Sequence, residues 1–421
     1  MRQAKLAASQ QVSGVQKKMN LEFGEKYEAL RAEVRAFCAR SWPLNDAEAR
    51  LGEREQGIAW RKRALAAGFL HRTVPRAYGG AGAAPDVMAE TVIRQEFDAA
   101  GVPHRGSVQG TRMLVPTLLE CGTEEQRREY IERTLSGELT WCQGYSEPGA
   151  GSDLASLQSR AELVGDDWVL RGQKIWTSNA VEADMMFGLF RTEPDAPKHA
   201  GISYLLIPMK TRGIEVRPLT MMQGGVDFCE VFFDGARIPA RNVVGRRGEG
   251  WKVTRATLKH ERVIGDSAGA RMSFDALVAL AKQVQRDGRL ATLQPSVRQR
   301  LAEIAGYVAT QEWAVARMLT AIHQNRDAQV MSELLMTKLL GTNLQQMIGK
   351  LALDLIPDVG LREPDPAEVV MGIRPFTPGR WVSHYMFSLA GAIAGGASNV
   401  QRNIIGERVL GLPRDPRPPG A

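Results

Sequence analysis

Apolar residues recur at helical spacing through the first third of the chain. In two segments, 27–39 and 88–97, they return every three to four residues, which is the spacing of a helix with one buried side. The two stripes are formed by Leu30, Val34 and Phe37, and by Met88, Val92 and Phe97. Glycine-containing turns at 78–82 and 121–123 separate the helical segments. The pattern predicts a helical domain over residues 21–137.

The middle of the chain, residues 138–250, changes to short β-prone runs. Gly, Asp or Pro bounds each run, for example Gly165-Asp166-Asp167 and Asp234-Gly235. The runs cover residues 168–170, 185–190, 202–207, 214–216 and 228–233. Short strands at this spacing favour a compact barrel or sandwich over a parallel sheet.

Long helices return from Trp251 onward. One wide apolar stripe runs through residues 301–322 and another through 335–355, as in a helical bundle. No G-x-G-x-x-G sequence follows a strand, which disfavours a Rossmann fold. The predicted fold is mostly α with a central β domain, and residues 251–421 form the final bundle.

Composition fits this three-part organisation. A chain of 421 residues exceeds what one core usually organises, and 44% hydrophobic with 24% charged residues is ordinary for a globular protein. No run of about 18 apolar residues predicts a membrane span. The four cysteines are scattered, so neither a disulfide framework nor a metal site is expected.

The first eighteen residues carry four basic side chains and no acidic one, without an apolar signal core. Residues 1–20 are expected to be a disordered leader in a cytoplasmic protein, with a mitochondrial transit peptide as the alternative. The net charge of +7 fits a nucleic-acid binder, a cleft for CoA phosphates or general solubility. Since Lys and Arg are spread along the chain, the net charge does not distinguish between these three interpretations.

Three segments carry chemistry. They are WCQGYSEPGAGSDLASL (141–157), GQKIWTSNA (172–180) and GGASNVQRNIIGERVLGLPR (395–414). Together, in this order and with the β region between two helical ones, they resemble the acyl-CoA dehydrogenase family. The style of the first and third is similar to the branch that acts on dicarboxylyl, branched, aromatic or steroid-derived acyl-CoAs.

The resemblance implies an N-terminal helical domain, a β-barrel middle domain and a C-terminal four-helix bundle. FAD is expected between the β domain and the bundle, with its adenosine end reaching a neighbouring subunit. The implied assembly is a homodimer or homotetramer, and a heteromer stays open.

Glycines 149 and 151 remove side-chain bulk, so that backbone N–H groups can approach an anion such as a phosphate of FAD or CoA. The alternative is an ordinary turn between domains. By resemblance, Gln143, Tyr145 and Ser146 line the isoalloxazine edge, and Ser152 faces the phosphates and the substrate.

In the second segment, the resemblance implies that Trp176 covers one flavin face and that Ser178 approaches N5. A buried core tryptophan is the alternative for Trp176.

Desaturation beside a thioester needs a carboxylate to remove the α-proton and a donor for the enolate-like oxygen. Many family members carry that carboxylate directly before the glycine of the third motif, where this chain has Gly395. A minority places it on a helix at the start of the bundle, and Glu261 matches that position. The resemblance therefore implies that Glu261 is the base and that the Gly395 backbone N–H polarises the thioester. A solvated glutamate paired with an arginine is the alternative for Glu261.

Other positions depart from the family pattern or serve the substrate. Arg262 is expected near the substrate entrance, and Ala394, in place of an aromatic residue, enlarges the acyl pocket. Ala397 and Asn399 stand where hydroxyl and Gln or Glu side chains usually touch the cofactor. The Arg-x-x-Phe element that grips the pyrophosphate across the dimer is not evident. A heteromeric partner supplying those contacts is one explanation.

The predicted activity is α,β-desaturation of an acyl-CoA, with an electron-transfer flavoprotein as oxidant and neither nucleic acid nor membrane as partner. Two alternatives stay open. One is a flavin oxidase or monooxygenase of the same fold, and the other is a catalytically degenerate subunit of a heteromeric dehydrogenase.

Overall fold

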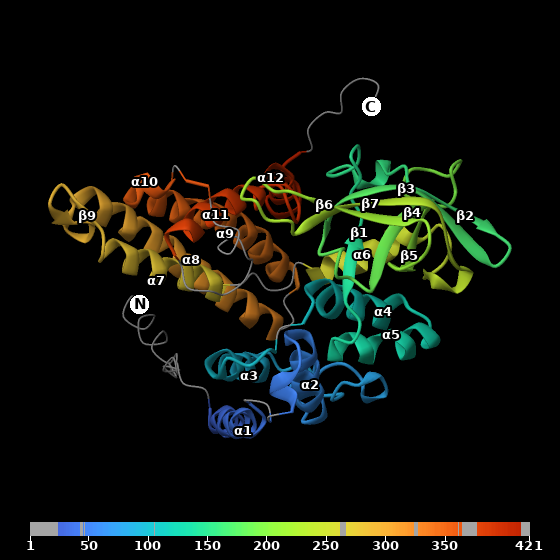
Figure 1. Ribbon diagram of the computed structural model, residues 1–421, viewed down its shortest axis with the longest axis horizontal. Coiled ribbons are helices and arrows are strands. Elements are labelled where there is room, and N and C mark those ends of the chain that lie inside the picture. Colours follow the sequence, from blue (N-terminus) through green and yellow to red (C-terminus); the bar gives the residue numbers. More distant parts are fainter. Residues whose placement is uncertain are drawn as a thin grey trace, which may run out of the picture.

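The computed structural model describes residues 24–42, 45, 47–104, 106–261, 267–323, 327–360, 362–363 and 377–413. A helical domain, a β-sheet and a helical bundle follow one another along the chain, and the sheet and the bundle stand side by side above the first helices in Figure 1. The predicted fold class is confirmed. The expected leader, residues 1–20, lies outside the described residues.

The N-terminal helices pack around aromatic side chains. Trp60 and Phe97 meet edge to face with ring centroids 5.0 Å apart, and both are buried with Val34 and Phe37. Thr123 caps its helix in a reciprocal arrangement with the Gln126 side chain. The helices are α1 (Glu25–Ser41), α2 (Glu53–Ala66), α3 (Val87–Ala100), the π-helical turn η3 (Val108–Leu114), α4 (Val115–Cys121) and α5 (Glu124–Ser136).

The central sheet has eight strands in the order β6-β7-β3-β2-β4-β5-β8, and β1 pairs with β4. Most neighbours are antiparallel, but β1 runs parallel to β4, with Trp141 opposite Met185. The strands are β1 (Trp141–Gly144), β2 (Arg160–Val164), β3 (Asp167–Ser178), β4 (Met185–Arg191), β5 (Ile202–Pro208), β6 (Ile214–Leu219), β7 (Phe228–Pro239) and β8 (Val243–Val244).

Strands β4 and β5 are buried on both faces. Phe187 and Tyr204 point to the core shared with the helical domain and α6 (Gly250–Glu261), whereas Phe190 and Leu205 point into the core of the β domain. Continuous apolar runs are the sequence signature of strands covered on both sides. The two strands therefore join the β domain rigidly to the helices beneath it.

The C-terminal bundle is built on two 29-residue helices, α8 (Pro295–His323) and α9 (Asp327–Leu355). Leu277, Val308 and Leu344 are fully buried in its core. No helix of the described residues is long and apolar enough to cross a membrane. The remaining elements are α7 (Ser267–Ala281), the hairpin β9 (Gln285–Arg286) and β10 (Arg289–Leu290), α10 (Pro357–Gly360), α11 (Pro378–Ala390) and α12 (Ser398–Ile404).

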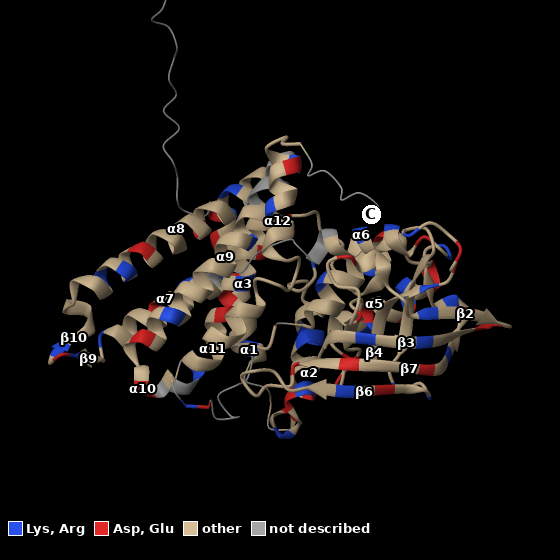
Figure 2. Cartoon of the chain, turned by 90° about the horizontal axis from the view of Figure 1, so that it is seen from above, with Lys and Arg blue, Asp and Glu red and all other residues tan. Residues whose placement is uncertain are grey.

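Acidic and basic residues lie close together on the central sheet and on α7 and α8, as Figure 2 shows. Ion pairs on the sheet join Arg171 to Asp234 and Arg217 to Glu215. On these elements Lys and Arg side chains are mixed with carboxylates, and they do not form a continuous basic stripe.

A partly buried histidine, His71, gives the fold a pH dependence. Burial lowers the pKa of His71 from 6.5 to about 4, and Arg61 and Arg112 lower it in the same direction. Between pH 6.5 and about 4 the unfolded chain thus binds a proton that the folded chain does not, so acid favours unfolding. We expect the free energy of unfolding to fall across this window by up to about 3 kcal/mol. Urea titrations at several pH values measure it, and His71→Gln should flatten the slope; an unchanged slope would contradict the assignment.

Candidate active site

The glycine-rich turn after β1 is closed by its own backbone. Glu147 and Ala150 exchange two main-chain hydrogen bonds of 3.0 Å each. A Cβ built on Gly149 or Gly151 would meet no protein atom within 4 Å, and neither glycine has a positive φ. The described residues give no packing or backbone reason for glycine there, whereas close approach of a group from outside the chain does. Ser152, next to these glycines, is exposed.

A buried ion pair that sequence reasoning missed lies under this turn. Lys174 of β3 is fully buried, and its Nζ lies 2.7 Å from the carboxylate of Glu147. The same carboxylate accepts backbone N–H bonds from Gln158 (2.5 Å) and Ser159 (2.9 Å). Burial alone would raise the pKa of Glu147, but Lys174 and these donors bring it below its ordinary value. Glu147 is therefore an ionised structural group and not a proton carrier.

Trp176 stands on an irregularity of β3. The pairing with β7 shifts register between Lys174 and Thr177, and Trp176 has a left-handed φ of +60°. Its side chain is 55% exposed, and its ring lies edge to face with Phe228 at 6.2 Å between ring centroids. Trp176 is thus not a core tryptophan. A large aromatic side chain in a strained backbone conformation and in the open is typical of a ligand-binding platform.

The residues predicted at the flavin edge differ in their accessibility. Gln143, Ser146 and Ser178 are partly exposed. Tyr145 is only 5% exposed, and its ring packs edge to face against Phe187 in the core. The Tyr145 ring thus points into the core, and its predicted place at the isoalloxazine edge stays a prediction.

The helix that ends at Glu261 is firmly seated. A Cβ on Gly250, its first residue, would lie 2.5 Å from the carbonyl carbon of Ser203, so only glycine allows this contact with β5. Thr257 hydrogen-bonds the side chain of Thr117 at 2.9 Å. Glu261 is the last residue of α6, one turn beyond Thr257. The Glu261 side chain and the whole of Arg262 lie outside the described residues, so their predicted roles stay predictions.

The third motif forms a left-handed turn between α11 and α12. Gly395 and Gly396 have φ values of +61° and +90°. Space is open around Gly395, but a Cβ on Gly396 would lie 2.4 Å from Nε2 of Gln401. Gln401 is 2% exposed and donates from Nε2 to the Gly395 carbonyl at 3.4 Å, while its Oε1 has no partner among the described residues. Gln401, another residue that sequence reasoning missed, thus anchors the carbonyl of Gly395 in the 395–396 peptide.

The other predicted residues of this turn face solvent to different degrees. Ala394 is exposed and Ala397 is half-buried. Asn399 is exposed and accepts a 3.1 Å hydrogen bond from Arg402. Among the described residues, the contacts of these three side chains do not indicate which ligand would bind here.

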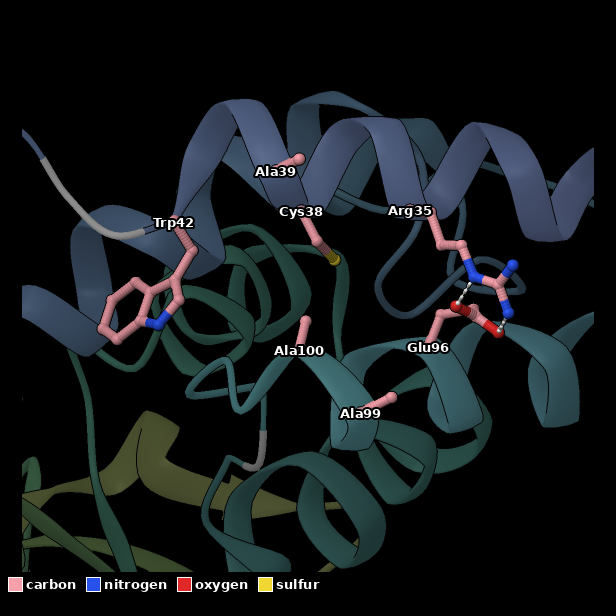
Figure 3. A pocket seen from close by; sticks show the side chains of 7 residues that line it. All are labelled: Arg35, Cys38, Ala39, Trp42, Glu96, Ala99 and Ala100. Atoms are coloured by element: carbon pink, nitrogen blue, oxygen red, sulfur yellow. Dashed lines mark hydrogen bonds and ion pairs between the residues drawn. The ribbon is translucent and has the colours of Figure 1, made fainter.

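Two cavities differ in their chemistry. One of about 460 Å³ lies between the glycine turn and β3, lined by Glu147, Gly149, Gln158 and Gly172. The other, of about 290 Å³, lies between α1 and α3, where Figure 3 shows Arg35 engaged with Glu96 and small alanines facing the space. This second pocket contains none of the motif residues, and its charges are already paired. No group of three or more metal-binding side chains occurs within the described part of the chain.

Three family descriptions match the chain in sequence order. "Acyl-CoA dehydrogenase, N-terminal domain" matches residues 24–138. "Acyl-CoA dehydrogenase, middle domain" matches residues 142–236, and "Acyl-CoA dehydrogenase, C-terminal domain" matches residues 248–410.

Individual proteins are similar over nearly the same length. Acyl-CoA dehydrogenase IpdE1 of Mycobacterium tuberculosis is 39% identical over 366 residues, covering 86% of this chain and 89% of its own. Among solved structures, the "Tcur3481-Tcur3483 steroid ACAD" is 30% identical with a TM-score of 0.74 and covers 94% of this chain and 100% of its own. The ChsE4-ChsE5 complex from Mycobacterium tuberculosis is 28% identical, with a TM-score of 0.74 and the same coverage.

Proposed function

The chain belongs to the acyl-CoA dehydrogenase family, whose members are FAD-dependent oxidoreductases, and from this we propose that it introduces a 2,3-double bond into an acyl-CoA thioester. One observation carries the proposal: an exposed, strained Trp176 stands beside an open glycine turn that a buried ion pair holds in place. Neither feature serves the packing of the described chain, and both fit a planar cofactor with phosphates.

The residues present fit FAD. Trp176 and Ser178 would hold the isoalloxazine, and the N–H groups of Gly149 and Gly151 with Ser152 would hold the phosphates. When bound, FAD supplies the acceptor for the hydride that leaves the β-carbon.

Proton removal is assigned to Glu261. Its backbone lies at the end of α6, a helix that packs against β5 and α4. The carboxylate is therefore carried by a firmly placed element. The Gly395 N–H donates to the thioester oxygen as negative charge develops there, which lowers the cost of removing the α-proton. A helix-borne base and a glycine at 395 are compatible because no atom of the described residues lies within 4 Å of a Cβ at that position.

The acyl group that we propose is bulky and ring-bearing, derived from a steroid. One structural relative at 30% identity is titled a steroid ACAD, and the small, exposed Ala394 borders the glycine turn. Two of the relatives carry paired names, Tcur3481-Tcur3483 and ChsE4-ChsE5. They support a heteromeric assembly in which a second chain completes the cofactor contacts, with an electron-transfer flavoprotein as the acceptor of electrons.

Gln401 offers a test of the Gly395 donor. Gln401→Leu keeps roughly the volume but removes the Nε2 bond to the Gly395 carbonyl, which anchors the 395–396 peptide. The Gly395 N–H lies in the preceding peptide and shares the Gly395 Cα with this anchor, so its direction toward the thioester oxygen should become less fixed. We expect flavin reduction to slow by about tenfold, with KM and FAD affinity near wild type. Stopped-flow reduction with saturating substrate measures the rate. A proportional loss of FAD affinity would instead indicate a purely structural glutamine.

An anaerobic screen of acyl-CoAs, from short branched to ring-bearing chains, tests the function directly. Bleaching of the visible flavin band by a ring-bearing thioester, followed by reoxidation with an electron-transfer flavoprotein, is the expected result. Rapid reoxidation by oxygen would favour a flavin oxidase. Absence of bleaching by every thioester, in the presence of the partner chain, would favour a degenerate subunit.

A further inference from the structure

We propose that Glu147 and Lys174 are positioning residues that set the spacing between the glycine turn and Trp176, and so shape the cleft for the cofactor. The inference rests on the proposed function, because it presumes that this cleft receives FAD. It adds two residues to the site that touch neither cofactor nor substrate.

The pair connects three separate segments of the site. Its Glu147 end lies in the glycine turn and accepts the N–H groups of Gln158 and Ser159, where the chain returns toward β2. Its Lys174 end lies two residues before Trp176 and also approaches the Tyr145 carbonyl at 3.4 Å. One buried contact of 2.7 Å thus fixes the turn, the return segment and β3 relative to one another.

Backbone contacts repeat the same connection. Ile175 donates to the Ser146 carbonyl at 2.9 Å, on the other side of Lys174 from the return segment. Gly172 approaches Ser159 so closely that a Cβ would lie 2.7 Å from its Cα. The 460 Å³ cavity between the turn and β3 is walled by Glu147, Ser159 and Gly172. The Glu147 end of the ion pair therefore borders open space, whereas its Lys174 end is buried against the ring of Phe190.

Physical chemistry argues that such a pair is kept for geometry. Removing two charges from water costs about as much as their attraction returns, so a neutral pair of similar volume often folds equally well. A Lys side chain 0% exposed against the ring of Phe190 is thus a weak source of stability. The two side chains contact each other and three backbone groups, those of Tyr145, Gln158 and Ser159. These directional contacts specify the position of the turn in a way that an apolar pair cannot.

The test compares FAD binding by the full-length chain in its native assembly and by the double variant Glu147→Gln/Lys174→Met. Both charges are lost together, and Met keeps the contact with Phe190. We expect the cofactor-free double variant to unfold within a few degrees of wild type, yet to bind FAD about tenfold or more weakly. The bound flavin band should also lose its vibronic shoulder. The matched control is Arg171→Gln/Asp234→Asn, an exposed pair that joins β3 to β7 and should leave FAD affinity unchanged when removed.

Wild-type FAD affinity and spectrum in the double variant would overturn the proposal, as would equal weakening in the control. If the double variant does not fold, Glu147→Asp keeps the charge and withdraws it by one methylene. It should weaken FAD binding several-fold with native stability, and unchanged binding would overturn the proposal. No thioester enters these measurements, so failure of every acyl-CoA to reduce the flavin would sink the proposed function and leave this inference standing.

Discussion

Replacement of Glu261 by Gln is expected to slow anaerobic reduction of bound flavin by acyl-CoA by roughly 10²–10⁴-fold. Gln is nearly isosteric with Glu but cannot accept the α-proton, so the thioester should bind without reacting. Folding and FAD content should stay at wild-type levels, since Glu261 occupies the last position of α6 and contributes no interior turn. Stopped-flow absorbance at the visible flavin band measures the rate.

Glu249→Gln is the matched control for this change. Glu249 is exposed and precedes the other end of the same helix, and the variant should reduce its flavin at the wild-type rate. Adding Gly395→Glu to Glu261→Gln should restore part of the rate, because a Cβ at 395 meets no atom within 4 Å, although the φ of +61° costs about 1 kcal/mol. Full bleaching of Glu261→Gln alone would assign the proton to another group.

The second large effect concerns stability. Lys174→Met alone should lower the free energy of unfolding by about 3–5 kcal/mol, because it leaves the Glu147 carboxylate buried without its cation. Lys174 is 0% exposed, so water cannot replace the lost ammonium group without opening the sheet. The double variant with Glu147→Gln should recover most of the loss, since no unpaired charge remains.

Urea unfolding of the three cofactor-free proteins measures these differences. Arg171→Gln on the same strand is the control, because its ion pair is exposed and should change stability by no more than about 0.5 kcal/mol. Equal stability of Lys174→Met and wild type would show that Glu147 finds other compensation. A double variant less stable than the single would show that the pair itself is stabilising.

The periodicity of apolar residues was sufficient to predict the order of helical, β and helical regions. Residues 301–322 and 335–355, for example, lie within α8 and α9. The arrangement of strands was not accessible in this way. The parallel pairing of β1 with β4 depends on contacts between Trp141 and Met185, 44 residues apart, and local spacing carries no information on such partners.

The motifs led to Trp176, Gly149 and Gly395 but not to the groups that support them. In the sequence, Glu147 and Lys174 each look like ordinary surface residues and lie 27 residues apart. Only the fold brings the Lys174 Nζ within 2.7 Å of the Glu147 carboxylate. The burial of Lys174 could nevertheless have been predicted from strand alternation. Residues 168 and 170 of β3 are buried, and residue 174, an even number of positions further, lies on the same face of the strand. The inward ring of Tyr145 escaped prediction because residue 145 follows β1, where strand alternation no longer applies.

The two main-chain bonds across the Glu147–Ala150 turn join residues of this chain and need no atom of a ligand. Little conformational entropy is then lost when a dinucleotide enters, and association should be fast and nearly rigid. Calorimetry should accordingly give a small negative heat-capacity change, set by the surface of ligand and cleft that becomes hidden. The much larger value that accompanies coupled ordering of a loop is not expected.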